Sequence, residues 1–167
     1  PKQAIINDIC EELMDFYKFI KDENNREEFK KELYEYAENW EKIPKYLSLF
    51  ETKLFQLYEQ YKSNKIELSE LKKIINEVLK KDVDRFNGLF FKSFCLDEKN
   101  LLDQIISNLI SKLRRTKEIE KIRGKLPDGD LYKNIETAFR SGFYMHFRDV
   151  MNFNGNKYKI SLAKKIA

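Results

Sequence analysis

Three side chains near the carboxyl end of the chain stand one helical turn apart: Arg140, Tyr144 and Arg148. Residues at positions i, i+4 and i+8 share one face of an α-helix, so we expect these three to form a ridge. Guanidinium groups can hold phosphates and a tyrosine ring can stack on a base, which is the chemistry of a nucleic-acid contact. The same spacing is typical of the polar boundary around a core helix, and the sequence leaves both interpretations open.

A dense group of cations precedes this ridge. Residues 112–125 contain seven basic side chains and only two acidic ones, whereas residues 11–42 contain eleven acids and six bases. The net charge of +4 is modest, but the chain is polarised into an acidic front and a basic middle. Such a cluster can follow a phosphate backbone, although cations are also common at helix C-termini. The residues that we expect to contact nucleic acid are Lys112, Arg114, Arg115, Lys121, Arg123, Arg140 and Arg148.

The amino end carries a different signal. Ile5 and Ile6 belong to a short apolar run that ends in Asn7 and Asp8, a pattern typical of a buried strand that passes into a helix. Nucleotide-binding α/β folds place an acid at this point to hold ribose hydroxyls. Asp8 is therefore a candidate nucleoside ligand, and it also suits the N-cap of the helix that follows.

Other kinds of active site find little support. His146 is the single histidine, which excludes a histidine pair or a His-rich metal site within these 167 residues. Cys10 and Cys95 lie far apart and in no zinc-ligand spacing. A Gly-rich phosphate loop is missing. We predict neither a metal site nor a catalytic residue in this chain.

Helical periodicity dominates the elements that must position these residues. The composition is 36% charged and 14% aromatic, with 5 Gly and 3 Pro, which argues against disorder and against a many-stranded barrel. We predict a mainly α fold, a bundle of six to seven helices with one short N-terminal strand. Pro44 should separate two helices, and Asp97 and Asp130 should cap two others. The expected helices cover residues 11–21, 26–42, 45–63, 69–81, 97–124 and 130–152, and residues 82–96 are ambiguous in type.

The sequence also bears on the setting of the protein. It contains no uncharged apolar run of about 18 residues and no pattern typical of a signal peptide, so we expect no membrane association. Two distant cysteines suit a reducing cytoplasm. The chain starts inside the expected strand and stops inside the helical pattern of residues 160–167, so we expect it to be part of a longer protein.

Two segments carry a family resemblance. Residues 1–21, PKQAIINDICEELMDFYKFIK, resemble the second conserved segment of Dam-like adenine-specific DNA methyltransferases, in which a strand ending Asn-Asp precedes a helix of the type Leu-x-x-Phe-Tyr-x-x-Ile. Residues 134–152, NIETAFRSGFYMHFRDVMN, resemble a helix that leads toward target recognition in one branch of that family. The helices of residues 25–119 match no motif and can be a helical insert specific to one branch of the family.

This resemblance implies transfer of a methyl group from S-adenosylmethionine to the 6-amino group of adenine in double-stranded DNA, as in restriction–modification systems. Asp8 would hold the cofactor ribose. The family's Gly-containing cofactor loop and its Asp-Pro-Pro-Tyr motif are both missing, so we expect this chain alone neither to bind cofactor tightly nor to methylate. The resemblance implies that the chain is a fragment of a larger α/β enzyme. It then consists of a strand–helix edge of the cofactor-binding fold (1–22), a helical insert or bundle (23–119) and a helical segment adjoining DNA recognition (120–167).

Two further functions remain open. Arg140 and His146 match the loose pattern of HEPN-type ribonucleases, in which an arginine precedes a histidine by a few residues. Those enzymes are all-helical and use the pair across a dimer. The other possibility is a non-enzymatic helical interaction module, because aromatic stripes left exposed to water bind partners.

Overall fold

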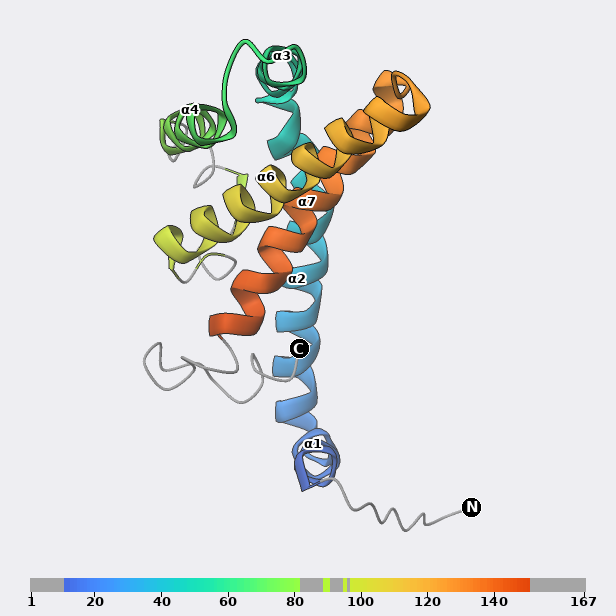
Figure 1. The fold of residues 1–167 in the computed structure, drawn as a ribbon. Coiled ribbons are helices and arrows are strands. Elements are labelled where there is room, and N and C mark those ends of the chain that lie inside the picture. The colour runs from blue at the N-terminus through green and yellow to red at the C-terminus, as the bar shows by residue number, and fades with distance from the viewer. Residues whose placement is uncertain (1–10, 82–88, 91–94, 96, 151–167) are drawn as a thin grey trace.

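The computed structural model describes residues 11–81, 89, 90, 95 and 97–150, and these form six α-helices without a strand. The helices are α1 (Glu11–Lys21), α2 (Glu23–Ser48), α3 (Glu51–Lys62), α4 (Leu68–Lys80), α6 (Glu98–Arg123) and α7 (Asp128–Arg148) (Figure 1). The predicted mainly helical fold is confirmed in these ranges. The expected N-terminal strand, with Asp8, lies outside the described residues, as do the residues from 151 onward.

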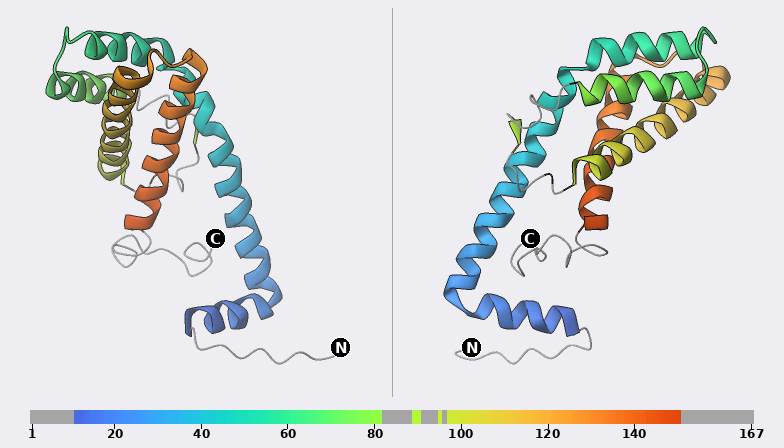
Figure 2. Two further views of the ribbon diagram at one scale, coloured as in Figure 1. Left: turned by 45° about the vertical axis from the view of Figure 1, so that its right-hand side comes forward. Right: turned by 90° about the vertical axis from the view of Figure 1, so that its left-hand side faces the viewer.

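The helices are arranged around a hairpin of α6 and α7, which make the most extensive helix–helix contact. α4 packs on α6, α3 packs on α4, and the long α2 lies along α7 (Figure 1). α2 then continues past the end of α7 and carries α1 at its far end, away from α3 and α4 (Figure 2).

Aromatic and aliphatic side chains fill the core between these helices. Tyr46 of α2 lies at the centre of an aromatic cluster, with ring centroids 5.1 Å from Phe50, 5.6 Å from Phe90 and 6.1 Å from Phe139, all in edge-on geometry. Edge-to-face pairs add to the free energy gained by burial alone. The cluster therefore fixes α2 against α7, which matters because the site described below lies between these two helices.

Gly142 permits the close approach of α6 and α7. A Cβ atom added to Gly142 would lie 2.6 Å from the Cα and 2.8 Å from the N of Ile105, both of them backbone atoms. A backbone atom cannot rotate away as a side chain can. Glycine is consequently the only residue that fits at this crossing without moving the helices apart.

Pro44 does not separate two helices, and this expectation is wrong: α2 continues through Pro44 to Ser48. Proline has no backbone N–H, so the carbonyl of Trp40, four residues earlier, loses its helical donor. Arg140 of α7 replaces that donor, with its Nη1 donating to the Trp40 oxygen over 3.3 Å. The helix tolerates its proline because a tertiary contact satisfies the orphaned carbonyl.

The predicted helix ends are partly confirmed. Asp97 caps α6, accepting a hydrogen bond from Asn100 N over 2.9 Å, and α6 ends before Gly124 at a φ of +85°. Asp130 is not a cap, because α7 already begins at Asp128 and Asp130 N donates to the Pro127 carbonyl over 2.9 Å. The extended conformation of Pro127 starts the helix two residues earlier than the sequence pattern indicated.

Candidate nucleic-acid interface

The acidic side chains near the C-terminal end of α6 already have partners. Glu118 lies 3.9 Å from Arg114, and both side chains are mostly exposed. Glu120 is buried and binds elements outside the basic cluster, as described next. These are the two acids of residues 112–125, so neither is available to the remaining cations of that segment.

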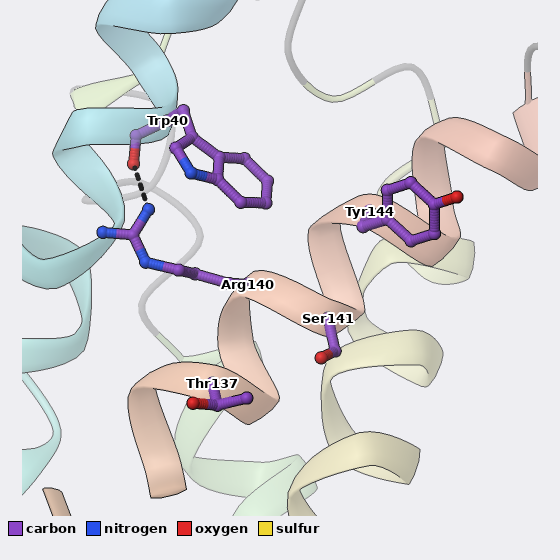
Figure 3. Close-up of a pocket in the computed structure, with 5 residues that line it drawn as sticks. All are labelled: Trp40, Thr137, Arg140, Ser141 and Tyr144. Carbon is purple, nitrogen blue, oxygen red and sulfur yellow. Dashed lines mark hydrogen bonds between the residues drawn. The ribbon is translucent and has the colours of Figure 1, made fainter. Parts of the chain in front are cut away.

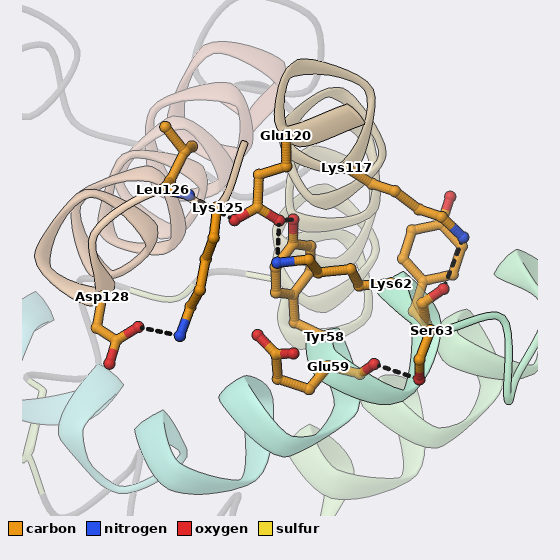
Figure 4. A network of polar contacts seen from close by, with 10 residues as sticks. Tyr58, Glu59, Lys62, Ser63, Lys117, Glu120, Lys125, Leu126 and Asp128 are labelled. Atoms are coloured by element: carbon orange, nitrogen blue, oxygen red, sulfur yellow. Dashed lines mark hydrogen bonds and ion pairs between the residues drawn. The ribbon is translucent and has the colours of Figure 1, made fainter. Parts of the chain in front are cut away.

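Glu120 lies in a polar network that joins three parts of the fold (Figure 4). Its Oε2 accepts hydrogen bonds from the Tyr58 hydroxyl over 2.6 Å and from Lys62 Nζ over 2.9 Å, and its Oε1 accepts one from Leu126 N over 2.7 Å. Burial alone raises the pKa of this carboxyl, but these hydrogen bonds and the Lys62 charge together hold it below its usual 4.5. The network ties α3 and α6 to the loop before α7.

Lys117 also makes contacts within the fold. Its Nζ donates to the Tyr61 carbonyl over 2.6 Å and to Asn64 Oδ1 over 2.8 Å, and it lies 4.1 Å from the Tyr61 ring centroid. Asn64 adopts a positive φ of 57°, which closes α3 and turns its side chain toward this lysine. Lys117 is therefore engaged in the tertiary structure.

Besides Arg114, three of the predicted cations on α6 are exposed: Arg115, Lys121 and Arg123. Within the described part of the chain none of them lies within ion-pair distance of an acidic side chain. Lys112 is half-buried, and Arg114 has only the long pair with Glu118. At about 100° per residue, Arg114 and Lys121 lie on the same side of α6, Arg115 lies about 100° around the helix from Arg114, and Arg123 lies about 180° from it. We call Arg114, Arg115, Lys121 and Arg123 the α6 cation group; it surrounds the helix end and does not form one flat patch.

The predicted ridge on α7 exists, but its members differ. Tyr144 is 59% exposed and Arg148 is exposed, whereas the Arg140 side chain is only 25% exposed. Arg140 Nε donates to Glu136 Oε1 over 2.8 Å, and its guanidinium carbon lies 5.3 Å from the Trp40 ring centroid. The charge of Arg140 is thus largely compensated by Glu136, whereas Arg148 has no acidic partner among the residues that the structure describes.

An open pocket of about 310 Å³ lies beside this ridge (Figure 3). The indole of Trp40, from α2, and the ring of Tyr144, from α7, stand at two sides of it, and Thr137, Arg140 and Ser141 line the α7 side. Sequence reasoning placed Tyr144 and Arg140 on a ridge but did not predict the roles of Trp40, Thr137 and Ser141. Trp40 and Arg140 are 100 residues apart, so no local pattern could have joined them.

His146 lies on the opposite side of α7 and is 0% exposed. Its Nδ1 lies 2.8 Å from Asn100 Oδ1, and the neighbouring Asp149 accepts a hydrogen bond from Gln104 over 2.7 Å. Burial lowers the pKa of His146 to about 4, against the opposing charges of Asp97 and Asp149. The imidazole is therefore neutral near pH 7. Within one chain, Arg140 points to α2 and His146 to α6, so the two residues of the ribonuclease pattern do not meet.

The described residues contain neither a metal-ligand group nor a membrane-spanning helix. No group of three or more histidine, cysteine, aspartate or glutamate side chains there could hold a metal ion. Cys95 is a free thiol whose pKa is raised to about 12, mainly by burial and then by Glu98 and Asp97. None of the helices in the described ranges is both long and apolar enough to cross a membrane. Asp8, the residue that the resemblance assigns to S-adenosylmethionine, lies outside these ranges.

Comparisons with protein-family models, with curated proteins and with solved structures found no match to the chain.

Proposed function

We propose that this chain is a helical nucleic-acid-binding module whose main contact with the phosphate backbone is the α6 cation group. The observation that supports this proposal is the charge balance at the end of α6. Both acids of that segment are already paired, and Arg115, Lys121 and Arg123 are exposed without an acidic partner in the described part of the chain. Exposed, uncompensated cations are what binding to a phosphate backbone requires.

The structure permits an estimate of how strongly such binding depends on salt. Four members of the α6 cation group contribute a slope of about 0.9 each to the logarithmic dependence of affinity on salt concentration. A fourfold increase in salt should then weaken binding roughly 100-fold. The exposed pair between Arg114 and Glu118 does not alter this estimate much, because ion pairs in water are weak.

We further propose that the module works within an adenine-specific DNA methyltransferase that uses S-adenosylmethionine and acts on double-stranded DNA. The resemblance of residues 1–21 and 134–152 to that family supports this setting. In this proposal α6 and α7 supply contacts with the DNA backbone, and the parts of the enzyme that carry the cofactor loop and the catalytic motif supply the chemistry. The 167 residues alone should therefore bind DNA but transfer no methyl group to it.

The experiment is a titration of duplex DNA at several salt concentrations with matched triple variants. The variant Arg115→Ala/Lys121→Ala/Arg123→Ala should reduce the salt slope by about 2.7, at 0.9 for each lost contact. The control Lys72→Ala/Lys73→Ala/Lys80→Ala removes the same charge from exposed positions of α4 and should leave most of the slope in place.

Two results would contradict the proposal. Affinity that does not change with salt would exclude backbone contacts, and equal losses in the two triple variants would show that only net charge matters. Methyl transfer to DNA by the 167-residue chain would contradict the division of labour, because the chemistry would then reside in residues that lack both family motifs.

A further inference from the structure

We infer that the pocket between α2 and α7 binds one unpaired nucleobase, so that the chain holds single-stranded or locally unpaired nucleic acid at a site separate from the α6 cation group. This inference rests on the proposed function, since it names the part of the nucleic acid that the α7 face takes. It is carried by the pocket itself, which Trp40, Thr137, Arg140, Ser141 and Tyr144 line.

The shape of the pocket suits a flat ring. Its volume of about 310 Å³ is near the lower end of the range of small-molecule sites. Two aromatic side chains from different helices offer π-faces, and every nucleobase has a π-face on which they can stack (Figure 3). The pocket is open to solvent, as is necessary for a base that remains attached to its strand.

The electrostatics favour a neutral ring over a phosphate inside the pocket. The one cation in its lining, Arg140, is paired with Glu136 over 2.8 Å and also donates to the Trp40 carbonyl. We therefore regard Arg140 as a positioning residue that fixes the Trp40 indole, with its guanidinium carbon 5.3 Å from the ring centroid. Pro44 in turn helps to set the position of Arg140, because the missing N–H of Pro44 leaves the Trp40 carbonyl free to accept the hydrogen bond from Arg140.

The polar groups around the pocket complete the site. Thr137 Oγ1 donates to the Lys133 carbonyl over 2.7 Å, so its hydroxyl can only accept from a ligand. Ser141 Oγ has no hydrogen bond with another described residue and can donate or accept at the edge of a base. Arg148 lies one helical turn beyond Tyr144, about 6 Å of rise, where it can meet the phosphate next to the base.

Trp40 is the only tryptophan of the chain, so its fluorescence reports directly on this pocket. A short single-stranded oligodeoxyadenylate should quench the Trp40 emission on binding. An oligonucleotide of the same length without bases, and a fully paired duplex of that length, should bind with little quenching. The oligonucleotide without bases carries the same backbone charge as the single strand and the duplex carries about twice as much, so weak quenching by both separates stacking from the electrostatic contact.

Substitutions in the pocket provide a second test of the inference. Tyr144→Ala should weaken binding of the single strand by about 5- to 100-fold, the effect typical of losing one stacking partner, and should leave duplex binding unchanged. Tyr34→Ala removes a tyrosine of α2 that is 72% exposed and lies outside the pocket lining, and should change neither. Ser141→Phe, which places a ring inside the pocket, should abolish quenching while the duplex still binds.

The outcomes distinguish this inference from the proposed function. If single strand and duplex bind with a steep salt dependence but Trp40 is not quenched, the pocket inference is overturned and the α6 contact stands. The inference also fails if Tyr144→Ala behaves like Tyr34→Ala. If neither nucleic acid binds at all, both proposals fail together.

Discussion

Replacement of Gly142 by alanine tests the packing on which both proposed sites depend. The alanine Cβ would lie 2.6 Å from Ile105 Cα and 2.8 Å from Ile105 N, whereas non-bonded carbon atoms pack at about 3.5–4.0 Å. α6 and α7 would therefore have to separate by about 1 Å at the crossing where they make their most extensive contact. Because the obstructing atoms belong to the backbone, no rotamer change can absorb the added methyl group.

The expected magnitude follows from two opposing effects. Overpacking of a tight interface costs about 1–3 kcal/mol, while replacing glycine by alanine inside a helix recovers up to about 1 kcal/mol. The net effect of Gly142→Ala should be a loss of about 1–2 kcal/mol of unfolding free energy. For a chain of this size the loss corresponds to a decrease of about 2–8 °C in Tm.

Thermal unfolding followed by far-UV circular dichroism measures this change. Gly129→Ala is the matched control, because a Cβ there would meet no atom within 4 Å, and it should raise stability by about 0.4–1 kcal/mol. Adding Ile105→Ala to Gly142→Ala should not restore stability, since the Cα and N contacts persist. The reasoning is refuted if Gly142→Ala is as stable as the parent chain, because helix propensity alone would then decide the outcome.

Two further predictions concern buried polar groups. The pKa of His146 is about 4 in the folded chain and has its ordinary value of 6.5 in the unfolded chain. Because the unfolded chain binds the proton more readily, the contribution of His146 to stability is complete above pH 6.5 and is lost as the pH falls toward 4. His146→Gln should remove most of this pH dependence, measured by urea unfolding across that range, and an unchanged profile would contradict the assignment. Arg140→Met should leave the Trp40 carbonyl without a donor, whereas in a Pro44→Ala background the restored N–H should reduce the cost by about 1 kcal/mol. A double-mutant cycle with no coupling would show that Arg140 does not replace the missing donor.

The helices themselves were largely predictable because their signals are local. Apolar residues recur at helical spacing, Asp97 caps a helix through Asn100 N, and Gly124 ends it, all within a few residues of sequence. The prediction at Pro44 was wrong because the free-energy cost of a proline inside a helix depends on whether the carbonyl that loses its donor finds another one. That donor, Arg140, lies 100 residues away, and no local rule could supply it.

The candidate site likewise combines local features that the sequence predicted with tertiary contacts that it did not predict. The sequence predicted the ridge of Arg140, Tyr144 and Arg148, because residues four apart share a helix face. It did not predict that Arg140 is paired, since this depends on Glu136 and on α2 packing beside α7. Trp40 became part of the pocket only through that packing.

The sequence by itself determined the helical character of this protein and the positions of most helix ends, because backbone hydrogen bonds and side-chain periodicity act over a few residues. It also determined how many cations the basic segment contains. Only the tertiary structure decided which cations remain available, because neutralisation depends on distant groups: Lys117 contacts Tyr61 across 56 residues, and Glu120 contacts Tyr58 across 62. Charge can be counted along a chain, but its compensation depends on distances in space.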